Sequence, residues 1–591
     1  MSEIKRPPVM EMMKDKNNSV EYVRIKEMFG DEEIEVIYKK SSDATEYVDR
    51  EISGWGFYSK LNQRSYVKNG IVCDQDVPVK MRDGATIYVD IYRPEGADKV
   101  PAIISWGFYG KRPGDTPKTW QILGVPPKTV SKMAKFESPD PGYWVKQGYA
   151  VVNVDARGTG NSEGKLRPWQ TQDGKDGYDL IEWLATQSWC TGKIGMSGNS
   201  AVAMAQWYVA AEQPPHLACI APWEGTNDIY RQFACKGGIP MTGFNEFVFR
   251  DIRGKEFVED HMEMLKEHPL MDAYWEDKVA NLSKIRIPCY MTGSWSHQLH
   301  LTGSVNAFRA IRSPKKWIRI HREFEWEDLY TPSSLRDLKE FFDRYLKEIN
   351  NGWELIPRVR LEVQDAYDFD YDKFRTETDF PIARTEYKKL YLNAANESLA
   401  DAPVDETAKI SYDAENGYAY FDYEFKEETE LTGYFKLKVW VEADGHDDLD
   451  LNVVVMKIDT DGEVLPTYVF HNWDYMGTAG CLRASLRELD EATSTEFQPR
   501  YTFKNEQKIG KGEIVPLEIE INPTSKIWHE GEKLRVFLSC WRNIGGIDTF
   551  EHELITKGNH VIHTGKGYDS YLLIPVIPPK YKSKTGNAIY R

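Results

Sequence analysis

The 591-residue sequence predicts an α/β domain followed by an all-β domain. Before about Trp353, short apolar runs alternate with helix-like segments, which is typical of βαβ units and a parallel sheet. Beyond it, apolar and polar residues alternate one by one, which is typical of half-buried strands. The runs are PAIISW, GYAVVNVD, KIGMS and LACIAP in the first half, and TGYFKLKVWVEA, LDLNVVVMKI, IVPLEIEI and EKLRVFLS in the second.

Three segments are expected along the chain. Residues 1–69 are polar and charge-mixed, and we interpret them as a partly helical N-terminal extension. Residues 70–353 form the α/β domain, and residues from about 226 to 284 interrupt its rhythm with helical patterns, as an inserted cap would. Residues 354–591 form the β domain, either a jelly roll or another sandwich.

The composition excludes several classes of partner. A formal net charge of -17 repels nucleic acid and anionic membrane surfaces. No stretch approaches the roughly 20 apolar residues that a membrane span needs, and the first residues lack an apolar signal core. We therefore expect a cytoplasmic protein that binds neither nucleic acid nor membrane. A homo-oligomer is left open.

A serine stands where a short buried strand meets an Ala-rich helix, in the segment GKIGMSGNSAVAMAQW. This is Ser200, and Gly198 and Ala201 supply the small neighbours that so tight a turn needs. Val202 replaces the second glycine of the G-x-S-x-G pattern, so the match to a nucleophile elbow is incomplete. The alternative is a serine that merely caps the helix.

Further motifs follow one another along most of the chain. They are MRDG (81–84), WGFYGK (106–111), DARGTGNSEG (155–164), IEWLATQSWCTGKIGMSGNS (181–200), FFDRYLK (341–347), LRASLRELD (482–490) and PLEIEINPTS (516–525). In this order they resemble the cocaine esterase and α-amino-acid ester hydrolase family, relatives of X-prolyl dipeptidyl aminopeptidases. The resemblance implies an α/β-hydrolase fold with a helical cap, followed by a jelly roll that packs on it and helps to close the site.

The resemblance also implies roles for single residues. Tyr109 corresponds to a tyrosine that donates its phenol to the oxyanion, together with the N–H of Ala201, and α/β-hydrolases do place a donor in the loop after this strand. The base is expected after the last strand of the sheet, where KKWIRI runs into His321. We therefore expect His321 to take the proton of Ser200 and return it to the leaving group.

The acid of the triad is missing from its expected place. After the strand IPCYMTG the family has an aspartate, whereas this chain has Ser296 or His297 there. Glu224, at the end of the preceding strand, can reach the imidazole, and so can Glu325 from the loop that carries His321. A third possibility is that no acid exists, which could cost as much as about 10⁴-fold in rate. The sequence does not choose among the three.

A metal site is the alternative to serine chemistry. His297, His300 and His321 could hold a zinc-bound hydroxide, although only the number of imidazoles supports this. We therefore expect no metal and no other cofactor. In DARGTGNSEG, we expect Asp155 and Arg157 to brace the loop rather than to act in catalysis.

The sequence thus predicts a serine hydrolase that cleaves a small ester or amide through an acyl-enzyme. Many aromatic residues near the strand ends favour a substrate with an apolar or aromatic group. The alternatives are an acyltransferase that uses the same residues, an X-prolyl dipeptidyl peptidase, and a degenerate hydrolase fold that only binds. Sugar binding by the β domain is a further, weaker alternative.

Overall fold

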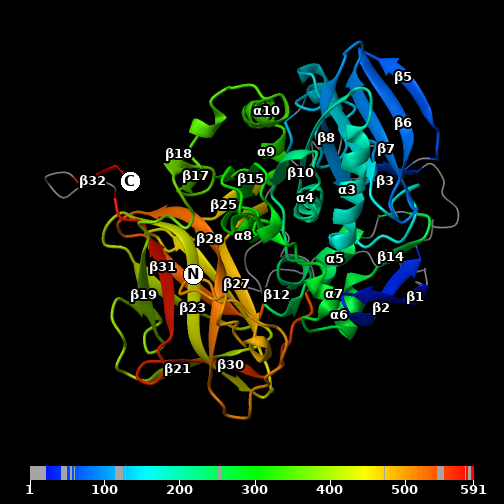
Figure 1. Cartoon of the computed structure of the whole chain (residues 1–591). Helices are drawn as coiled ribbons and strands as arrows, with labels where there is room; N and C mark the ends of the chain where they lie inside the picture. Colours follow the sequence, from blue (N-terminus) through cyan, green and yellow to red (C-terminus); the bar gives the residue numbers. More distant parts are fainter. Residues whose placement is uncertain are drawn as a thin grey trace.

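The computed structural model describes residues 21–40, 50–52, 56–58, 60–113, 124–126, 128–249, 252, 254–470, 473–541, 552–579, 581–582 and 588–590. Two regions lie side by side in Figure 1: an α/β region coloured blue to green, and a β region coloured yellow to red. Within the described residues, no helix combines the length and the apolar composition that crossing a membrane requires.

A mostly parallel sheet forms the first region. Its strands, in spatial order, are β5 (Arg64–Lys68), β6 (Ile71–Lys80), β7 (Thr86–Pro94), β9 (Ala150–Asp155), β8 (Val100–Gly107), β10 (Cys190–Asn199), β11 (Leu217–Trp223), β15 (Cys289–Ser294), β16 (Lys316–His321) and β17 (Val359–Gln364). The pairs from β9 to β17 are parallel, as predicted, and the first three strands are antiparallel to their neighbours. β17 follows the predicted boundary at residue 353, so the sheet continues into the second half of the chain.

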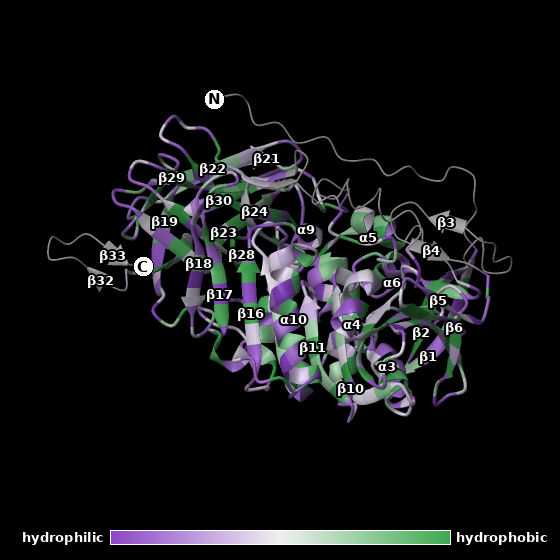
Figure 2. Cartoon of the chain, turned by 90° about the horizontal axis from the view of Figure 1, so that it is seen from above, coloured by the Kyte–Doolittle hydropathy of each residue, from purple (hydrophilic) through white to green (hydrophobic). Residues whose placement is uncertain are grey.

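Helices pack on the central strands of this sheet. They include α2 (Pro141–Trp144), α3 (Thr171–Ala185), α4 (Ser200–Ala211), α8 (Leu301–Ala310), α9 (Glu325–Leu329) and α10 (Pro332–Leu346), with short 3₁₀ turns η1 (Val145–Gln147) and η4 (Trp353–Leu355). The amphipathic α10 shows purple and green stripes in Figure 2. The helix α4 is apolar all round and almost entirely buried, as expected of a helix inside a core. It can approach α3 closely because Gly177 has no side chain; a Cβ there would lie 2.4 Å from Val209.

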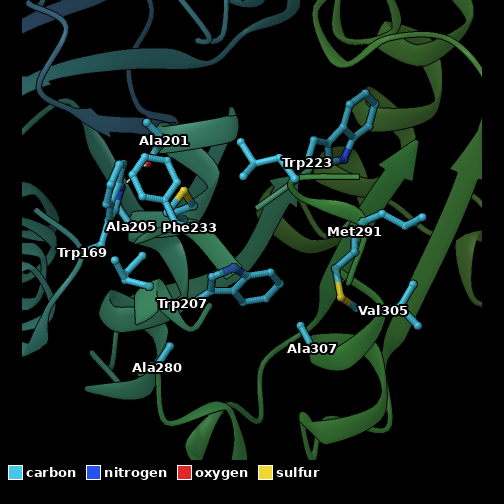
Figure 3. Packing of buried hydrophobic residues seen from close by; sticks show 14 of the residues in the cluster. Trp169, Ala201, Ala205, Trp207, Trp223, Phe233, Ala280, Met291, Val305 and Ala307 are labelled. Atoms are coloured by element: carbon cyan, nitrogen blue, oxygen red, sulfur yellow. Dashed lines mark hydrogen bonds between the residues drawn. The ribbon is translucent and has the colours of Figure 1, made fainter. Parts of the chain in front are cut away.

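Buried aromatic residues pack around α4. Figure 3 shows Trp207 of this helix in the interior, and Trp169 and Phe233 beside Ala201 and Ala205. All three aromatic rings are at most 2% exposed. Burial of such large side chains contributes most of the stability of a core, and here it also fixes the start of α4, where Ser200 lies.

The segment between β11 and β15, where the sequence analysis expects a cap, consists of short helices and strands; it is called the cap below, and its role over the site stays a prediction. Its elements are η2 (Tyr230–Ala234), α5 (Thr242–Phe249), α6 (His261–Glu267), α7 (Ala273–Glu276) and η3 (Leu282–Lys284), with strands β12 (Cys235–Lys236), β13 (Ile239–Pro240) and β14 (Phe257–Glu259). The strand β14 joins the cap to the N-terminal segment.

The N-terminal segment corrects the prediction of a partly helical extension. Its described part forms a hairpin of β1 (Tyr22–Phe29) and β2 (Glu32–Lys40), and β2 pairs with β14. The short strands β3 (Arg50–Ile52) and β4 (Gly56–Tyr58) follow. Exposed and less exposed residues do alternate along β1, and Val36 and Tyr38 of β2 are fully buried. The many charged side chains of the segment obscure this strand pattern in the sequence.

The second region is all β, as predicted. One antiparallel set runs β19–β31–β23–β28, and another runs β22–β29–β24–β27. The bounds are β18 (Asp370–Glu377), β19 (Glu386–Asn393), β20 (Ser398–Ala400), β21 (Ala408–Asp413), β22 (Tyr418–Glu424), β23 (Thr429–Asp444), β24 (Asp450–Ile458), β25 (Thr467–Phe470), β26 (Trp473–Tyr475), β27 (Gly477–Arg483), η5 (Ala484–Leu486), β28 (Val515–Trp528), β29 (Lys533–Ser539), β30 (Asn559–Thr564), β31 (Tyr571–Val576), β32 (Tyr581–Lys582) and β33 (Ala588–Tyr590). The finer description as a jelly roll stays a prediction.

Candidate active site

Ser200 lies at the sharp turn between β10 and α4. Its φ angle of 51° is left-handed, a conformation that costs energy for a residue with a side chain. Gly198, two residues earlier, has φ 151°, and a Cβ on it would lie 2.2 Å from a methyl group of Val202. The side chain of Val202 therefore packs directly against Gly198. The turn forms with this valine at the position where the G-x-S-x-G pattern has its second glycine.

His300 is the imidazole that contacts this serine. Its Nε2 atom lies 3.0 Å from the Oγ atom of Ser200; His300 is buried, and Ser200 is half-buried. His300 stands at the N-cap of α8, in the loop that follows β15. Burial holds the pKa of His300 well below its usual value, so the imidazole is neutral and Nε2 can accept a proton.

The expectation that His321 faces Ser200 is corrected by this geometry. His321 ends β16, its Nδ1 lies 3.0 Å from the carbonyl oxygen of Glu323, and its Nε2 lies 3.2 Å from Glu224 and 3.3 Å from Asp328. Burial alone lowers the pKa of His321, but the two carboxylates raise it to about 9. His321 is therefore a charged partner of buried acids, because the pleat of its strand directs the side chain toward them.

The two candidate acids lie on either side of His297. Glu224 follows β11, and its Oε2 lies 3.4 Å from Nδ1 of His297; Oε1 of Glu325, the first residue of α9, lies 3.6 Å from the same atom. The other oxygen of Glu325 lies 3.8 Å from Nε2 of His300. These separations exceed hydrogen-bond length, so neither carboxyl group holds the ring of His300 by a hydrogen bond.

Glu137 is a site residue that the sequence analysis missed. Its backbone oxygen accepts a hydrogen bond from the N–H of Asn199, and its carboxyl group accepts one of 3.1 Å from the indole of Trp326. Burial raises the pKa of Glu137 to about 8, while contacts from Trp326, the Ser200 hydroxyl and the Ala201 N–H oppose the rise. A neutral carboxyl group thus lies where the predicted oxyanion donor Ala201 points. No motif in its loop, KFESPDPG, gave a signal.

Tyr109 lies beside the same segment. It follows β8, its side chain is buried, and its ring meets the ring of Phe136 edge-on with centroids 5.3 Å apart. Phe136 immediately precedes Glu137. The structure therefore brings the predicted tyrosine to the segment that contacts Ser200, and its part in catalysis stays a prediction.

The loop DARGTGNSEG is braced by charges, as expected. Arg157 binds Asp176 at 2.6 Å and Asp83 at 3.0 Å, and Asp155 binds Lys111 at 2.6 Å. Each of these charges therefore has a partner that accounts for it without a catalytic role.

A small hollow of about 90 Å³ lies between the cap, the loop of residues 295–300 (the histidine loop) and the β region. Its lining includes Arg231, Lys236, Leu299, Cys481, Tyr501 and Asn522. The β region also holds the histidine loop directly: Asn522 accepts a hydrogen bond of 2.6 Å from Thr302 and donates one of 3.0 Å to Gln298. Gln298 in turn bonds to the backbone of Gly477 at 2.8 Å. The second region thus positions residues on both sides of His300.

Comparisons with known proteins agree with this architecture. The family model of X-Pro dipeptidyl-peptidase (S15 family) matches residues 83–252, and that of the X-Pro dipeptidyl-peptidase C-terminal non-catalytic domain matches residues 351–573. Cocaine esterase of Rhodococcus sp. (strain MB1 Bresler) is 23% identical over 85% of this chain and 98% of its own length.

Solved structures extend the likeness across both regions. An α-amino-acid ester hydrolase shares the fold, with a TM-score of 0.65 at 15% identity over 88% of this chain and 99% of its own. A CocE/NonD family hydrolase from Staphylococcus aureus has a TM-score of 0.80 at 38% identity, covering 86% of this chain and 94% of its own. An α/β-hydrolase-type domain with an all-β domain after it is therefore the shared architecture, and the chain belongs to the CocE/NonD family of hydrolases.

Proposed function

We propose that this hydrolase cleaves small esters or amides with Ser200 as its nucleophile and His300 as its general base. The observation that carries the proposal is the 3.0 Å contact between His300 Nε2 and Ser200 Oγ at a strained strand-to-helix turn. Strain of this kind persists only where the surrounding structure enforces it, and it is concentrated at functional sites.

The reaction has two halves. In the first, the Ser200 oxygen bonds to the carbonyl carbon while its proton passes to His300, which then gives it to the departing alcohol or amine. In the second, water attacks the acyl-enzyme, loses a proton to His300, and releases the acid and the serine. The Ala201 N–H, with Tyr109 or the neutral Glu137 as second donor, stabilises the tetrahedral oxyanion.

In this proposal the base comes from the loop after β15 and not from the end of β16. Glu325, from the segment after β16, lies 3.8 Å from Nε2 of His300, the same atom that faces Ser200. Nδ1 of His300, the atom that an orienting acid binds in a serine triad, has no hydrogen-bond partner among the described residues. We therefore assign no orienting acid to His300, and we assign Glu224 as the partner of His321.

Buried aromatic residues beside the nucleophile turn support a proposal for the substrate class. Trp169 donates a hydrogen bond from its indole to the backbone of Ala201, and its ring meets Phe108 and Phe233 edge-on. Aromatic walls favour an apolar or aromatic acyl group. The family models keep X-Pro dipeptides as a second substrate class, because both are described by that activity.

The test is intact-mass spectrometry after exposure to a fluorophosphonate. Wild-type protein should gain one adduct, Ser200→Ala should gain none, and Ser197→Ala, a matched control inside β10, should label like wild type. Turnover of nitrophenyl esters and of X-Pro nitroanilides then separates the two substrate classes. Absence of both labelling and turnover would overturn the serine mechanism and leave a binding protein; ester consumption that needs an added alcohol would indicate acyl transfer.

A further inference from the structure

Around His300 lies a group of buried donor atoms that lack hydrogen bonds. Among the described residues, Nδ1 of His297, Oε2 of Glu224 and Oε2 of Glu325 are fully buried and have no hydrogen-bond partner. A buried polar atom without a partner costs about 1–3 kcal/mol, and more if it is charged. Three such atoms from three neighbouring side chains require a common explanation.

The distances between these atoms suit a metal ion better than hydrogen bonds. Nδ1 of His297 lies 3.4 Å from Glu224 and 3.6 Å from Glu325, and Nε2 of His300 lies 3.8 Å from Glu325. Hydrogen bonds would be about 2.7–3.2 Å long. Ligands about 2.0–2.2 Å from a tetrahedral ion are instead separated by about 3.4 Å. One ligand atom from each of the two histidines and Glu325 lies within 4.8 Å of the others.

We propose that His297, His300 and Glu325 bind a zinc ion, with water in the fourth position. Two imidazoles and one carboxylate, with one position left for water, are a donor set that zinc accepts. The two rings stand at 89° to each other with centroids 4.8 Å apart, so their nitrogen lone pairs can converge without a clash.

His321 does not belong to this site. It is a cation between Glu224 and Asp328, and its Nδ1 faces the carbonyl oxygen of Glu323. Its contact with Oε1 of Glu224 leaves Oε2 facing His297, so Glu224 lies beside the three ligands and not among them.

The site implies a mode of regulation that rests on the proposed function. Nε2 of His300 cannot bind zinc and accept the proton of Ser200 at the same time. Zinc therefore competes with the serine for one lone pair, and the zinc-loaded protein is expected not to react with acylating agents. Chelation restores the free imidazole and with it the nucleophile.

The test uses the full chain, stripped with a chelator and then titrated with zinc chloride by calorimetry. We expect one zinc ion per chain, and with cobalt the intense visible absorption of a tetrahedral complex. His297→Gln should weaken zinc binding by more than about 100-fold, since loss of an outer partner alone costs about 10–100-fold. His216→Gln, in a surface pair with Glu182, is the matched control and should bind zinc like wild type.

Each outcome bears on the proposal separately from the hydrolase mechanism. If stripped wild-type protein takes up no zinc, or if His297→Gln binds it as tightly as wild type, the site is refuted whatever the activity. Glu325→Gln serves the same purpose if His297→Gln fails to fold. If zinc binds but fluorophosphonate labelling of Ser200 is unchanged, the competition is refuted. Labelling of the stripped protein reports on the serine mechanism alone.

Discussion

Nε2 of His300 lies 3.0 Å from Oγ of Ser200, although 100 positions separate the two residues in the chain. The parallel sheet brings them together, because β10 and β15 end at the same edge with only β11 between them. The loop after β15 thus supplies the imidazole, and the end of β16 supplies a cation that serves the neighbouring acids.

The first prediction separates the two histidines by activity. His300→Gln should reduce kcat/KM for a nitrophenyl ester by about 10⁶-fold, as loss of the histidine base of a serine triad does. His321→Gln should cost less, because this ring is charged and does not touch the serine. Steady-state rates of both folded variants test this. A larger loss from His321→Gln would return the role of base to His321.

The second prediction concerns alkaline pH. The pKa of Glu137, raised to about 8 by burial, leaves its carboxyl group neutral below that pH and charged above it. A carboxylate facing the Ala201 N–H would repel the developing oxyanion, so kcat/KM should fall as pH rises through 8. Glu137→Gln keeps the shape without the charge, and its profile should stay level up to at least pH 9. A wild-type profile that is level there would contradict this role for Glu137.

The local sequence pattern was enough to predict the turn at Ser200 but not to predict His300 as the base. Ser200 was predictable because a strand, a glycine and an Ala-rich helix are contiguous in sequence. The choice among three imidazoles depends instead on how the loop from 295 to 300 folds. That loop is fixed by Gln298, which bonds to Gly477 and Asn522, and by Ser296, which bonds to the backbone of Arg322. Such long-range contacts leave no local signal.

Glu137 and the N-terminal hairpin were also not predicted, again because long-range contacts determine their positions. Glu137 follows no motif, and only the folded chain places it under the elbow, where it contacts the first turn of α4. The N-terminal hairpin was hidden because charged residues occupy its exposed face, and its buried face is completed by β14, more than 200 residues away. The alternation of strands and helices, by contrast, is a local property, and the sheet formed as predicted.

The third prediction is a pH-dependent stability. The folded pKa of His321 is raised to about 9, above the value of about 6.5 for a free imidazole. Its ion pairs therefore stabilise the fold fully below pH 6.5, and this contribution is lost as pH rises through 9. The loss of stability caused by His321→Gln should thus be about 2–3 kcal/mol larger at pH 6 than at pH 10.

A matched control for this experiment is a histidine buried without charge. Burial lowers the pKa of His560 to about 4, so its ring is neutral over the whole range. At pH 6 the unfolded imidazole, with a pKa of about 6.5, takes up protons that the folded ring does not, so His560→Gln should cost about 1 kcal/mol less at pH 6 than at pH 10 in urea unfolding, the opposite direction to His321→Gln. Equal pH dependence of the two variants would show that His321 is not an ion-pair partner.

The fourth prediction tests the turn at the serine. Gly198→Ala places a methyl group 2.2 Å from Val202 on a backbone that disfavours any side chain, and overpacking of this kind costs about 1–3 kcal/mol. Gly462→Ala is the matched control, since it shares the left-handed backbone but meets no atom within 4 Å. Thermal unfolding should rank Gly198→Ala as the less stable, and fluorophosphonate labelling should be lost only there.

The fifth prediction tests whether hydrogen bonds from the β region hold the histidine loop in position. Asn522→Ala removes the hydrogen bonds to Thr302 and Gln298, so the loop that carries His300 gains freedom while every catalytic group remains. A base displaced by about 1 Å can cost as much as 10²-fold, so we expect kcat to fall by about 10- to 100-fold with KM changed less. Asn393→Ala, at a turn of the same region, should leave both constants unchanged. Equal effects of the two substitutions would mean that the β region acts on activity through stability alone, and not by holding His300 against Ser200.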